Sequence, residues 1–172
     1  ISLWAQTFKG RVVDFAGKGK ITYPDGVIVN DETTSNLTKN ENFVVLECVY
    51  RLLKLGYKPE CIELEPKWEA PHDIGGGGKA DVLVKDNAGE SFLLIECKTW
   101  GKEFDNYWKK TEQDGDQLFF YAVQKRSTKY LCMYASNWDN DELVRKSNII
   151  SLKDNTATLE SFDEPISFEK AN

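Results

Sequence analysis

The spacing of hydrophobic and polar residues changes several times along the chain. From about Lys39 to Leu55 the hydrophobic residues recur at helical spacing, at Phe43, Leu46, Val49, Tyr50 and Leu53. Gly56 follows as a stop signal, and Thr38 or Asn40 is placed to cap the first turn. This stretch predicts one amphipathic helix.

Short β-like runs lie on both sides of this helix. They are Gly10–Phe15, Lys20–Tyr23, Gly26–Val29, Glu60–Ala70, Lys79–Lys85, Ser91–Thr99, Lys129–Ala135 and Asn148–Leu152, with further strands expected in Thr156–Phe168. Gln117–Arg126 has the apolar stripe of a second helix, and Trp100–Asp116 is interpreted as a polar loop with aromatic residues. The order helix, three strands, helix, strand indicates an α/β domain with a mixed central sheet flanked by helices.

The two central runs predict a hairpin with a defined register. A tight turn at Ala88-Gly89 pairs residues whose numbers sum to 177, which sets Val82 opposite Ile95 and Asp81 opposite Glu96. Apolar residues then face apolar residues along the hairpin. The two carboxylates at its end lie about 5 Å apart, a costly arrangement unless a proton or a cation neutralises them.

Lys98 stands two residues after Glu96, so strand alternation places it on the same face. Two carboxylates with open positions suit Mg²⁺ or Mn²⁺, and a lysine beside them can orient a water or counter charge on a phosphate. The simpler alternative is a salt-bridged strand face in an ordinary sheet. Leu83, Leu94 and Phe92 on the same face argue for burial and so against that alternative.

The amino-acid composition excludes several classes of site and of protein. The 172 residues favour one domain, and 22 Lys plus Arg against 28 Asp plus Glu give a net charge of −6, so affinity for a DNA duplex should be weak. A single histidine, His72, excludes sites that need two imidazoles. The four cysteines form no CxxC motif, so neither a zinc ribbon nor a disulfide framework is expected. No apolar run approaches the roughly 18 residues of a membrane span, and no signal pattern opens the chain.

Three other motifs give weaker evidence about function. Gly75–Lys79 reads GGGGK, but Ala80 replaces the required Ser or Thr and a strand follows, so a hairpin turn is the better interpretation than a phosphate loop. Nothing orients His72 toward Cys97, and a buried thiol is favoured over a Cys–His nucleophile. The aromatic and lysine residues of 100–110 could grip nucleic acid, or form a small aromatic cluster in a folded loop.

Asp81 and the Glu96-Cys97-Lys98 triplet resemble the D…(D/E)xK signature of PD-(D/E)xK nucleases, with Ala80 where the signature's name has proline. Gln117-Leu-Phe-Phe-Tyr121 is similar to the QxxxY motif of several branches. Glu41, at the start of a helix that ends in Leu55-Gly56-Tyr57, resembles the helix glutamate of the nuclease domain in type I restriction enzyme R (motor) subunits. The resemblance covers Glu41 to about Trp138 and implies a restriction-endonuclease-like core.

The resemblance also implies roles. Asp81 and Glu96 would bind Mg²⁺, with Mn²⁺ as a substitute and the Cys97 carbonyl as an extra ligand. Lys98 would position the attacking water, and Glu41 would support the metal, with Glu47 as the competing helix carboxylate. Gln117 and Tyr121 would steady the site or contact DNA. The simpler alternatives are an amphipathic helix edge for Gln117 and Tyr121 and a favourable helix-dipole position for Glu41.

The expected function is therefore Mg²⁺-dependent hydrolysis of double-stranded DNA by a cytoplasmic endonuclease. The chain has no Walker motif and no ATP site, so a motor domain of the same polypeptide and specificity and methyltransferase subunits are the expected partners. We expect one nuclease domain in a larger protein, with a β-rich extension at 1–37, a core at 38–138 and a C-terminal extension at 139–172. The alternatives are a repair or recombination nuclease of the same superfamily and a non-catalytic nucleic-acid-binding or protein-binding module.

Overall fold

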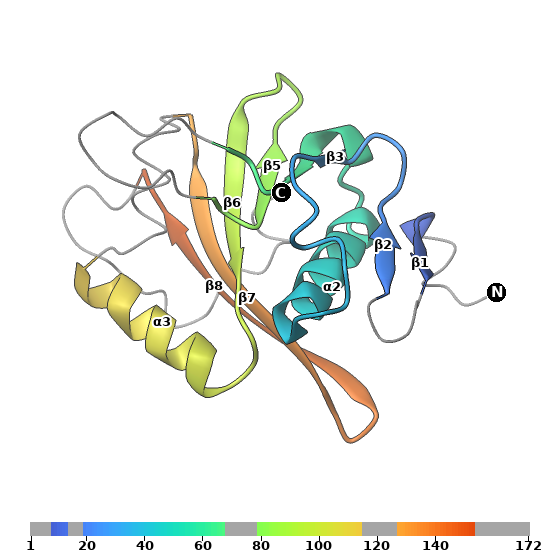
Figure 1. Ribbon diagram of the computed structural model, residues 1–172. Coiled ribbons are helices and arrows are strands. Elements are labelled where there is room, and N and C mark those ends of the chain that lie inside the picture. Colours follow the sequence, from blue (N-terminus) through green and yellow to red (C-terminus); the bar gives the residue numbers. More distant parts are fainter. Residues whose placement is uncertain (1–7, 14–18, 68–78, 115–126, 154–172) are drawn as a thin grey trace.

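A six-stranded mixed sheet forms the centre of the molecule, and its strand order is β3-β4-β5-β6-β7-β8 (Figure 1). The computed structural model describes residues 8–13, 19–67, 79–114 and 127–153. The strands of the sheet are β3 (Ile28–Val29), β4 (Ile62–Leu64), β5 (Val82–Lys85), β6 (Ser91–Cys97), β7 (Tyr130–Asp139) and β8 (Glu142–Ser151). The β3–β4 and β6–β7 pairs are parallel and the others antiparallel, which confirms the α/β class with a mixed sheet.

Two helices cover opposite faces of this sheet. Helix α2 (Asn40–Lys54) packs in one apolar cluster with strand residues such as Val82 and Ile95. Helix α3 (Lys102–Asp114) places Phe104 in a second cluster with Leu83 and Leu94. Because successive strand residues point to opposite faces, the two clusters lie on the two sides of the sheet.

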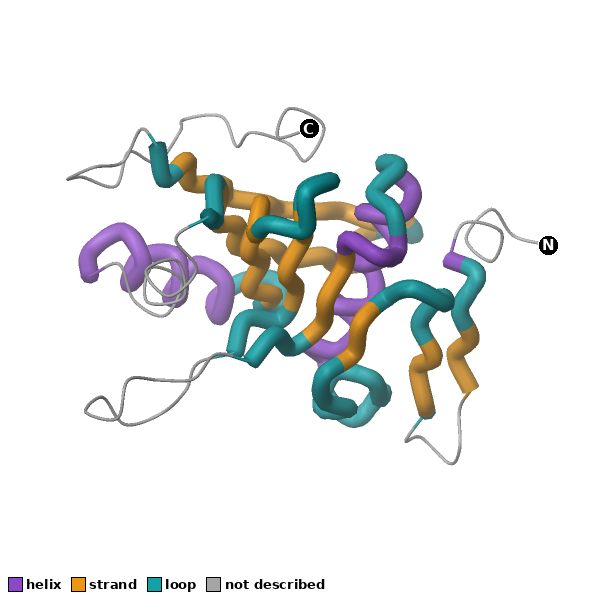
Figure 2. Tube along the Cα trace, turned by 90° about the horizontal axis from the view of Figure 1, so that it is seen from above, coloured by secondary structure: helices purple, strands orange, loops and turns teal. Residues whose placement is uncertain are grey.

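A smaller sheet lies apart from the main one (Figure 2). It pairs β1 (Arg11–Val13) with β2 (Lys20–Thr22) in antiparallel fashion. A 3-10 helix, η1 (Pro59–Cys61), leads into β4. Within the described ranges, no helix is both long enough and apolar enough to cross a membrane.

The predicted hairpin register is confirmed. Val82 pairs with Ile95, Leu83 with Leu94 and Val84 with Leu93, and the register shifts only at Lys85, beside the turn. The predicted helix is also confirmed to within a residue at each end, and Gly56 ends it with a φ of +99°, which glycine adopts without strain. The predicted caps were wrong. Lys39 is the N-cap residue, and it makes no side-chain capping hydrogen bond.

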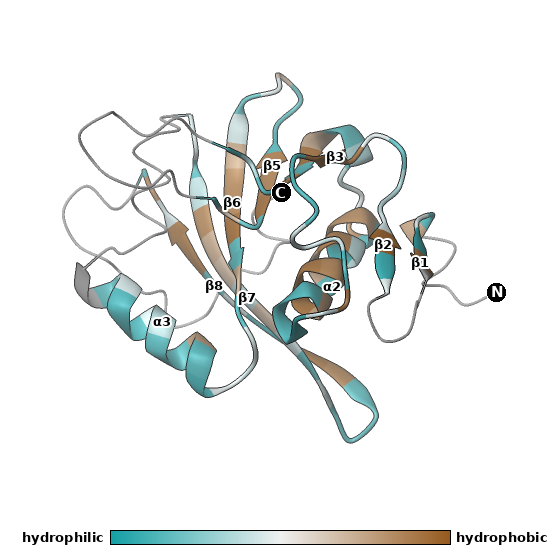
Figure 3. Ribbon diagram, viewed as in Figure 1, coloured by the Kyte–Doolittle hydropathy of each residue, from teal (hydrophilic) through white to brown (hydrophobic). Residues whose placement is uncertain are grey.

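Helix α3 corrects the interpretation of Trp100–Asp116 as a loop. Phe104, Tyr107, Trp108 and Thr111 recur at helical spacing and turn one stripe toward the sheet. The stripe is narrow, and the rest of the helix is strongly hydrophilic (Figure 3). The polarity of the segment therefore made the helical spacing of its apolar residues hard to recognise in the sequence. The helix predicted at Gln117–Arg126 lies outside the described residues.

The β7–β8 hairpin is longer than the sequence predicted. Its register pairs Tyr130 with Ser151 and continues to Asp139 opposite Glu142. Asn140 and Asp141 form the turn with φ values of 48° and 63°, the left-handed conformation that two-residue hairpin turns require. The strand after this turn therefore begins at Glu142 rather than Asn148, because the turn holds both strands in register.

Candidate active site

Four of the predicted site residues meet at one end of the β5–β6 hairpin. Asp81 directly precedes β5, Glu96 is the second-to-last residue of β6, and Lys98 directly follows β6. Glu41 comes from the first turn of α2. Burial of the apolar hairpin between the two helices fixes this end of the sheet, so the four side chains are held by three separate segments of the chain.

Lys98 is the centre of this group. Its Nζ donates hydrogen bonds to Glu96 Oε1 at 2.7 Å and to Glu41 Oε1 at 3.0 Å. The same ammonium lies 4.7 Å from the ring centroid of Tyr107 on α3. Lys98 is only 6% exposed, so these contacts are formed largely away from water. Buried ammonium groups are stable only when paired in this way.

Asp81 closes the hairpin end in a different way from the one predicted. The β5–β6 ladder stops at Val82 and Ile95, and the Asp81 carboxylate instead accepts a hydrogen bond from the Cys97 amide, with Oδ2 2.7 Å from the nitrogen. The Cys97 side chain is fully buried beside α2. The role of the Cys97 carbonyl as a metal ligand stays a prediction.

The electrostatics of the group favour neutralisation of the Asp81 carboxylate, by a proton or by an added cation. Burial raises the pKa of Asp81 well above its ordinary value, the charge of Glu96 raises it further, and the Cys97 amide and Lys98 lower it only in part. Burial alone would lower the pKa of Lys98, but Glu96 and Glu41 more than reverse this, so the pKa is raised and the ammonium stays protonated at neutral pH. Glu96 and Glu41 thus share one ammonium, and an ionised Asp81 adds a negative charge that a proton or a bound cation would neutralise.

The donor set fits magnesium. Mg²⁺ prefers carboxylate oxygens, keeps several waters and commonly binds through one or two carboxylates. Asp81 and Glu96 supply such a pair. Within the described ranges, no group of three or more His, Cys, Asp and Glu side chains has the spacing of a complete protein-only metal site.

The structure separates the two helix glutamates that the sequence left open. Glu41 contacts Lys98, whereas Glu47 accepts hydrogen bonds from the Tyr134 hydroxyl and from Arg145 Nε, the latter at 2.7 Å. Glu47 therefore belongs to a different cluster, which joins α2 to β7 and β8. Glu41 is the helix carboxylate of the candidate site.

Sequence reasoning missed Tyr107, which covers the ammonium of Lys98. The helical spacing of Phe104, Tyr107 and Trp108 was the signal that could have found it. Gln117 and Tyr121 lie outside the described residues, as do His72 and Gly75–Gly78, so their predicted roles stay predictions.

Neither a scan against protein-family models nor a search of curated proteins finds a match for this chain.

Proposed function

We propose that this chain is a Mg²⁺-dependent endonuclease domain of the PD-(D/E)xK type, with a restriction-endonuclease-like core. The observation that carries the proposal is the meeting of Asp81, Glu96, Lys98 and Glu41 at one end of the hairpin, with Lys98 hydrogen-bonded to both glutamates. Ordinary salt bridges lie at the surface, whereas this ammonium is buried and is bound by carboxylates from two elements. The grouping of Asp81, Glu96 and Lys98 supports phosphodiester hydrolysis as the proposed reaction.

Each side chain then has a distinct task. Asp81 and Glu96 would hold the metal, which would supply positive charge for the scissile phosphate and lower the pKa of a water. Lys98 stays protonated, so it donates hydrogen bonds to the attacking water or to the phosphate rather than removing a proton. Glu41 fixes the ammonium from the helix side, and the Tyr107 ring limits its movement.

The substrate of the proposed reaction is DNA, and partners would deliver it. A net charge of −6 gives the chain little intrinsic attraction for a polyanion. This agrees with the division of labour in a type I restriction-modification system, in which a motor domain and the specificity and methyltransferase subunits hold DNA. We propose the same cytoplasmic setting for this domain.

The first test is isothermal titration calorimetry with Mg²⁺ or Mn²⁺, followed by a plasmid-nicking assay. Asp81→Asn keeps the shape of the side chain and should abolish the heat of metal binding. Lys98→Met keeps the buried stem and should retain metal binding while nicking falls at least about 100-fold, the usual cost of losing a transition-state donor.

Lys85→Met is the matched control. Lys85 ends the same strand β5 and forms its own partly buried pair with Glu63, 2.6 Å from Nζ to Oε2. This pair lies at the far end of the strand from Asp81, so the control should keep both metal binding and nicking. Equal metal heats for wild type and Asp81→Asn would refute the proposed site.

A further inference from the structure

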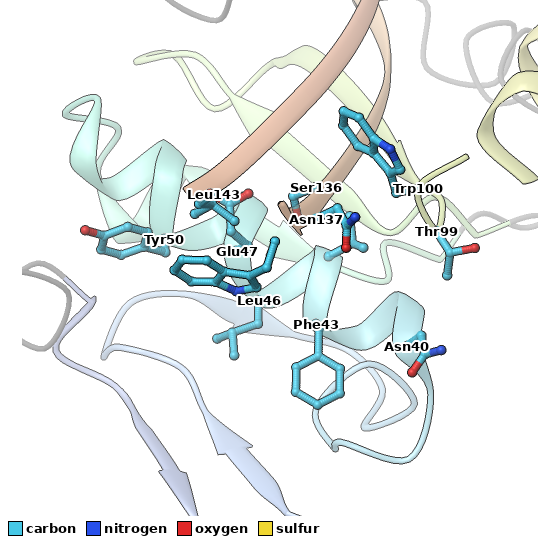
Figure 4. A pocket seen from close by; sticks show the side chains of 12 residues that line it. Asn40, Phe43, Leu46, Glu47, Tyr50, Thr99, Trp100, Ser136, Asn137 and Leu143 are labelled. Atoms are coloured by element: carbon cyan, nitrogen blue, oxygen red, sulfur yellow. The ribbon is translucent and has the colours of Figure 1, made fainter. Parts of the chain in front are cut away.

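A groove of about 600 Å³ opens beside the candidate site, between α2 and the β7–β8 hairpin (Figure 4). Phe43 and Leu46 line it from α2, Ser136 and Asn137 from β7, and Trp100 from the segment after β6. Figure 4 shows the Phe43 and Trp100 side chains on different walls, with Asn137 between them.

Three aromatic side chains in this groove are unusually exposed. Phe43 is 50% exposed, Trp100 is 41% exposed and Trp138, near the tip of the hairpin, is 69% exposed. Large apolar surfaces gathered in one place commonly mark a binding site, because leaving them in water is costly. Flat aromatic rings are the side chains on which unpaired nucleobases stack.

The polar part of the groove suits nucleobases as well. Glu47 is the one charged side chain among the described residues that line it, and this carboxylate is already paired with Arg145 and Tyr134. The amides of Asn40 and Asn137 provide both donors and acceptors for base edges. A neutral groove in an acidic chain admits the bases of a polyanion without facing them with a net negative charge.

Several residues that line the groove are sequence neighbours of the candidate site. Asn40 directly precedes Glu41, and Thr99 and Trp100 directly follow Lys98. Two residues of extended chain span at most about 7 Å, which is roughly two base rises of 3.4 Å. A DNA strand with a phosphate at Lys98 would therefore have its neighbouring base within reach of Trp100, and further unpaired bases would follow the groove toward Trp138.

We propose that this groove is a subsite for unpaired nucleobases next to the phosphate that is cut, with Trp138, Trp100 and Phe43 as stacking surfaces. In a duplex the faces of the bases are stacked on one another and only their edges are accessible. Bases can enter the groove only from a single-stranded, frayed or flipped-out stretch. The inference rests on the proposed nuclease function and specifies its substrate as DNA with unpaired bases at the cut.

The experiment measures the binding of the full chain in EDTA, where no metal-dependent cleavage occurs. Fluorescence anisotropy compares a labelled oligothymidylate with a hairpin duplex of equal nucleotide number. Trp138→Leu keeps apolar bulk but removes the ring, and it should weaken oligothymidylate binding about 5- to 150-fold, since stacking of one base is worth about 1–3 kcal/mol. Trp138→Phe keeps a ring and should stay close to wild type.

Ile28→Ala is the control, because Ile28 is a similarly exposed apolar residue on β3, 40% exposed, and does not line the groove. It should leave both affinities unchanged. The proposal is overturned by wild type that does not bind oligothymidylate, by Trp138→Leu that binds like wild type, or by an equal loss toward the duplex. Any of these results would leave a protein segment as the better occupant of the groove.

The two proposals fail separately. Stacking that depends on Trp138, in a chain that never nicks DNA in Mg²⁺, would support base binding in the groove and refute the nuclease, and with it the role of the groove beside a cut. Nicking that depends on Lys98 but not on Trp138, with equal rates on paired and bubble-containing plasmids, would support the nuclease and refute the subsite.

Discussion

Lys98 owes its position to contacts from three elements. Strand β6 supplies Glu96, helix α2 supplies Glu41 and helix α3 supplies the Tyr107 ring. A buried ammonium loses most of its hydration, so these contacts must replace it. Packing of both helices on the sheet therefore controls where the charge lies. The same dependence makes Glu41 hard to predict, because it is 57 positions away from Lys98 in sequence.

A second buried carboxylate, Glu65, lies close to the site. It follows β4 with a φ of +50°, is 2% exposed and donates its amide to the Asp81 carbonyl at 2.9 Å. The Thr33 hydroxyl donates to its carboxylate, and Lys79 Nζ is 3.9 Å away. Burial raises the pKa of Glu65, and Lys79 lowers it only in part.

Glu65→Gln should therefore stabilise the protein at neutral and alkaline pH. Below the pKa of the unfolded state, near 4.3, Glu65 is protonated in both states and costs nothing. As the pH rises through the higher folded pKa, the folded protein must ionise a buried group, and its free energy of unfolding falls. The melting temperature of Glu65→Gln should exceed that of wild type at about pH 8 and equal it at about pH 4.

Glu90→Gln is the control for this comparison, because Glu90 is exposed at the β5–β6 turn. It should change the melting temperature little at either pH. A lower melting temperature for Glu65→Gln at about pH 8 would mean that the ion pair with Lys79 outweighs the burial of the carboxylate.

The N-terminus of helix α2 lacks a side-chain cap, so a substitution there can stabilise the helix. Lys39 occupies the N-cap with extended backbone angles of −124° and 143°, but its side chain accepts no hydrogen bond from the first turn. Its positive charge also lies at the positive end of the helix dipole. Lys39→Ser should raise the free energy of unfolding by about 0.5–1 kcal/mol, measured by urea denaturation.

Lys39→Ala separates the two causes. It removes the charge without adding an acceptor, so it should give less than the serine variant. Equal gains from both substitutions would show that the charge, and not the missing cap, limits the helix start.

Local patterns predicted the elements that depend on neighbouring residues. The α2 stripe and the Val82–Val84 register follow from hydrophobic spacing and one turn, and both are confirmed. Helix α3 was missed because its apolar stripe occupies few positions in a very polar segment. The early start of β8 was missed because two residues of left-handed backbone, and not hydrophobicity, determine it.

At the scale of the whole molecule, one sheet separates two apolar clusters and brings the site to a shared end. The sequence predicted the α/β class and the residues Asp81, Glu96 and Lys98 as one group. The resemblance named Glu41 and left Glu47 as the alternative, and only the packing of α2 on the sheet separates the two glutamates. The aromatic groove also arises only from this packing, because its walls come from segments as far apart in sequence as Asn40 and Leu143.

The four free cysteines report on the integrity of this packing. Cys48, Cys97 and Cys132 are fully buried behind the site, whereas Cys61 is partly accessible. Burial also raises the pKa of Cys97 and Cys132, so the reactive thiolate is scarce. An aromatic disulfide reagent such as DTNB should modify Cys61 quickly and the other three slowly, at a rate limited by opening of the core.

The rate of this slow modification can be measured for every variant made at the site and reports how often its core opens. A variant that has lost chemistry alone should keep the wild-type rate of slow modification, while one with a loosened core should react faster. Three rapid thiols in the wild type would contradict the packing described for α2 against the sheet. Inactivity and unfolding, which an activity assay confuses, can thus be told apart in the same tube by counting released thiolate over time.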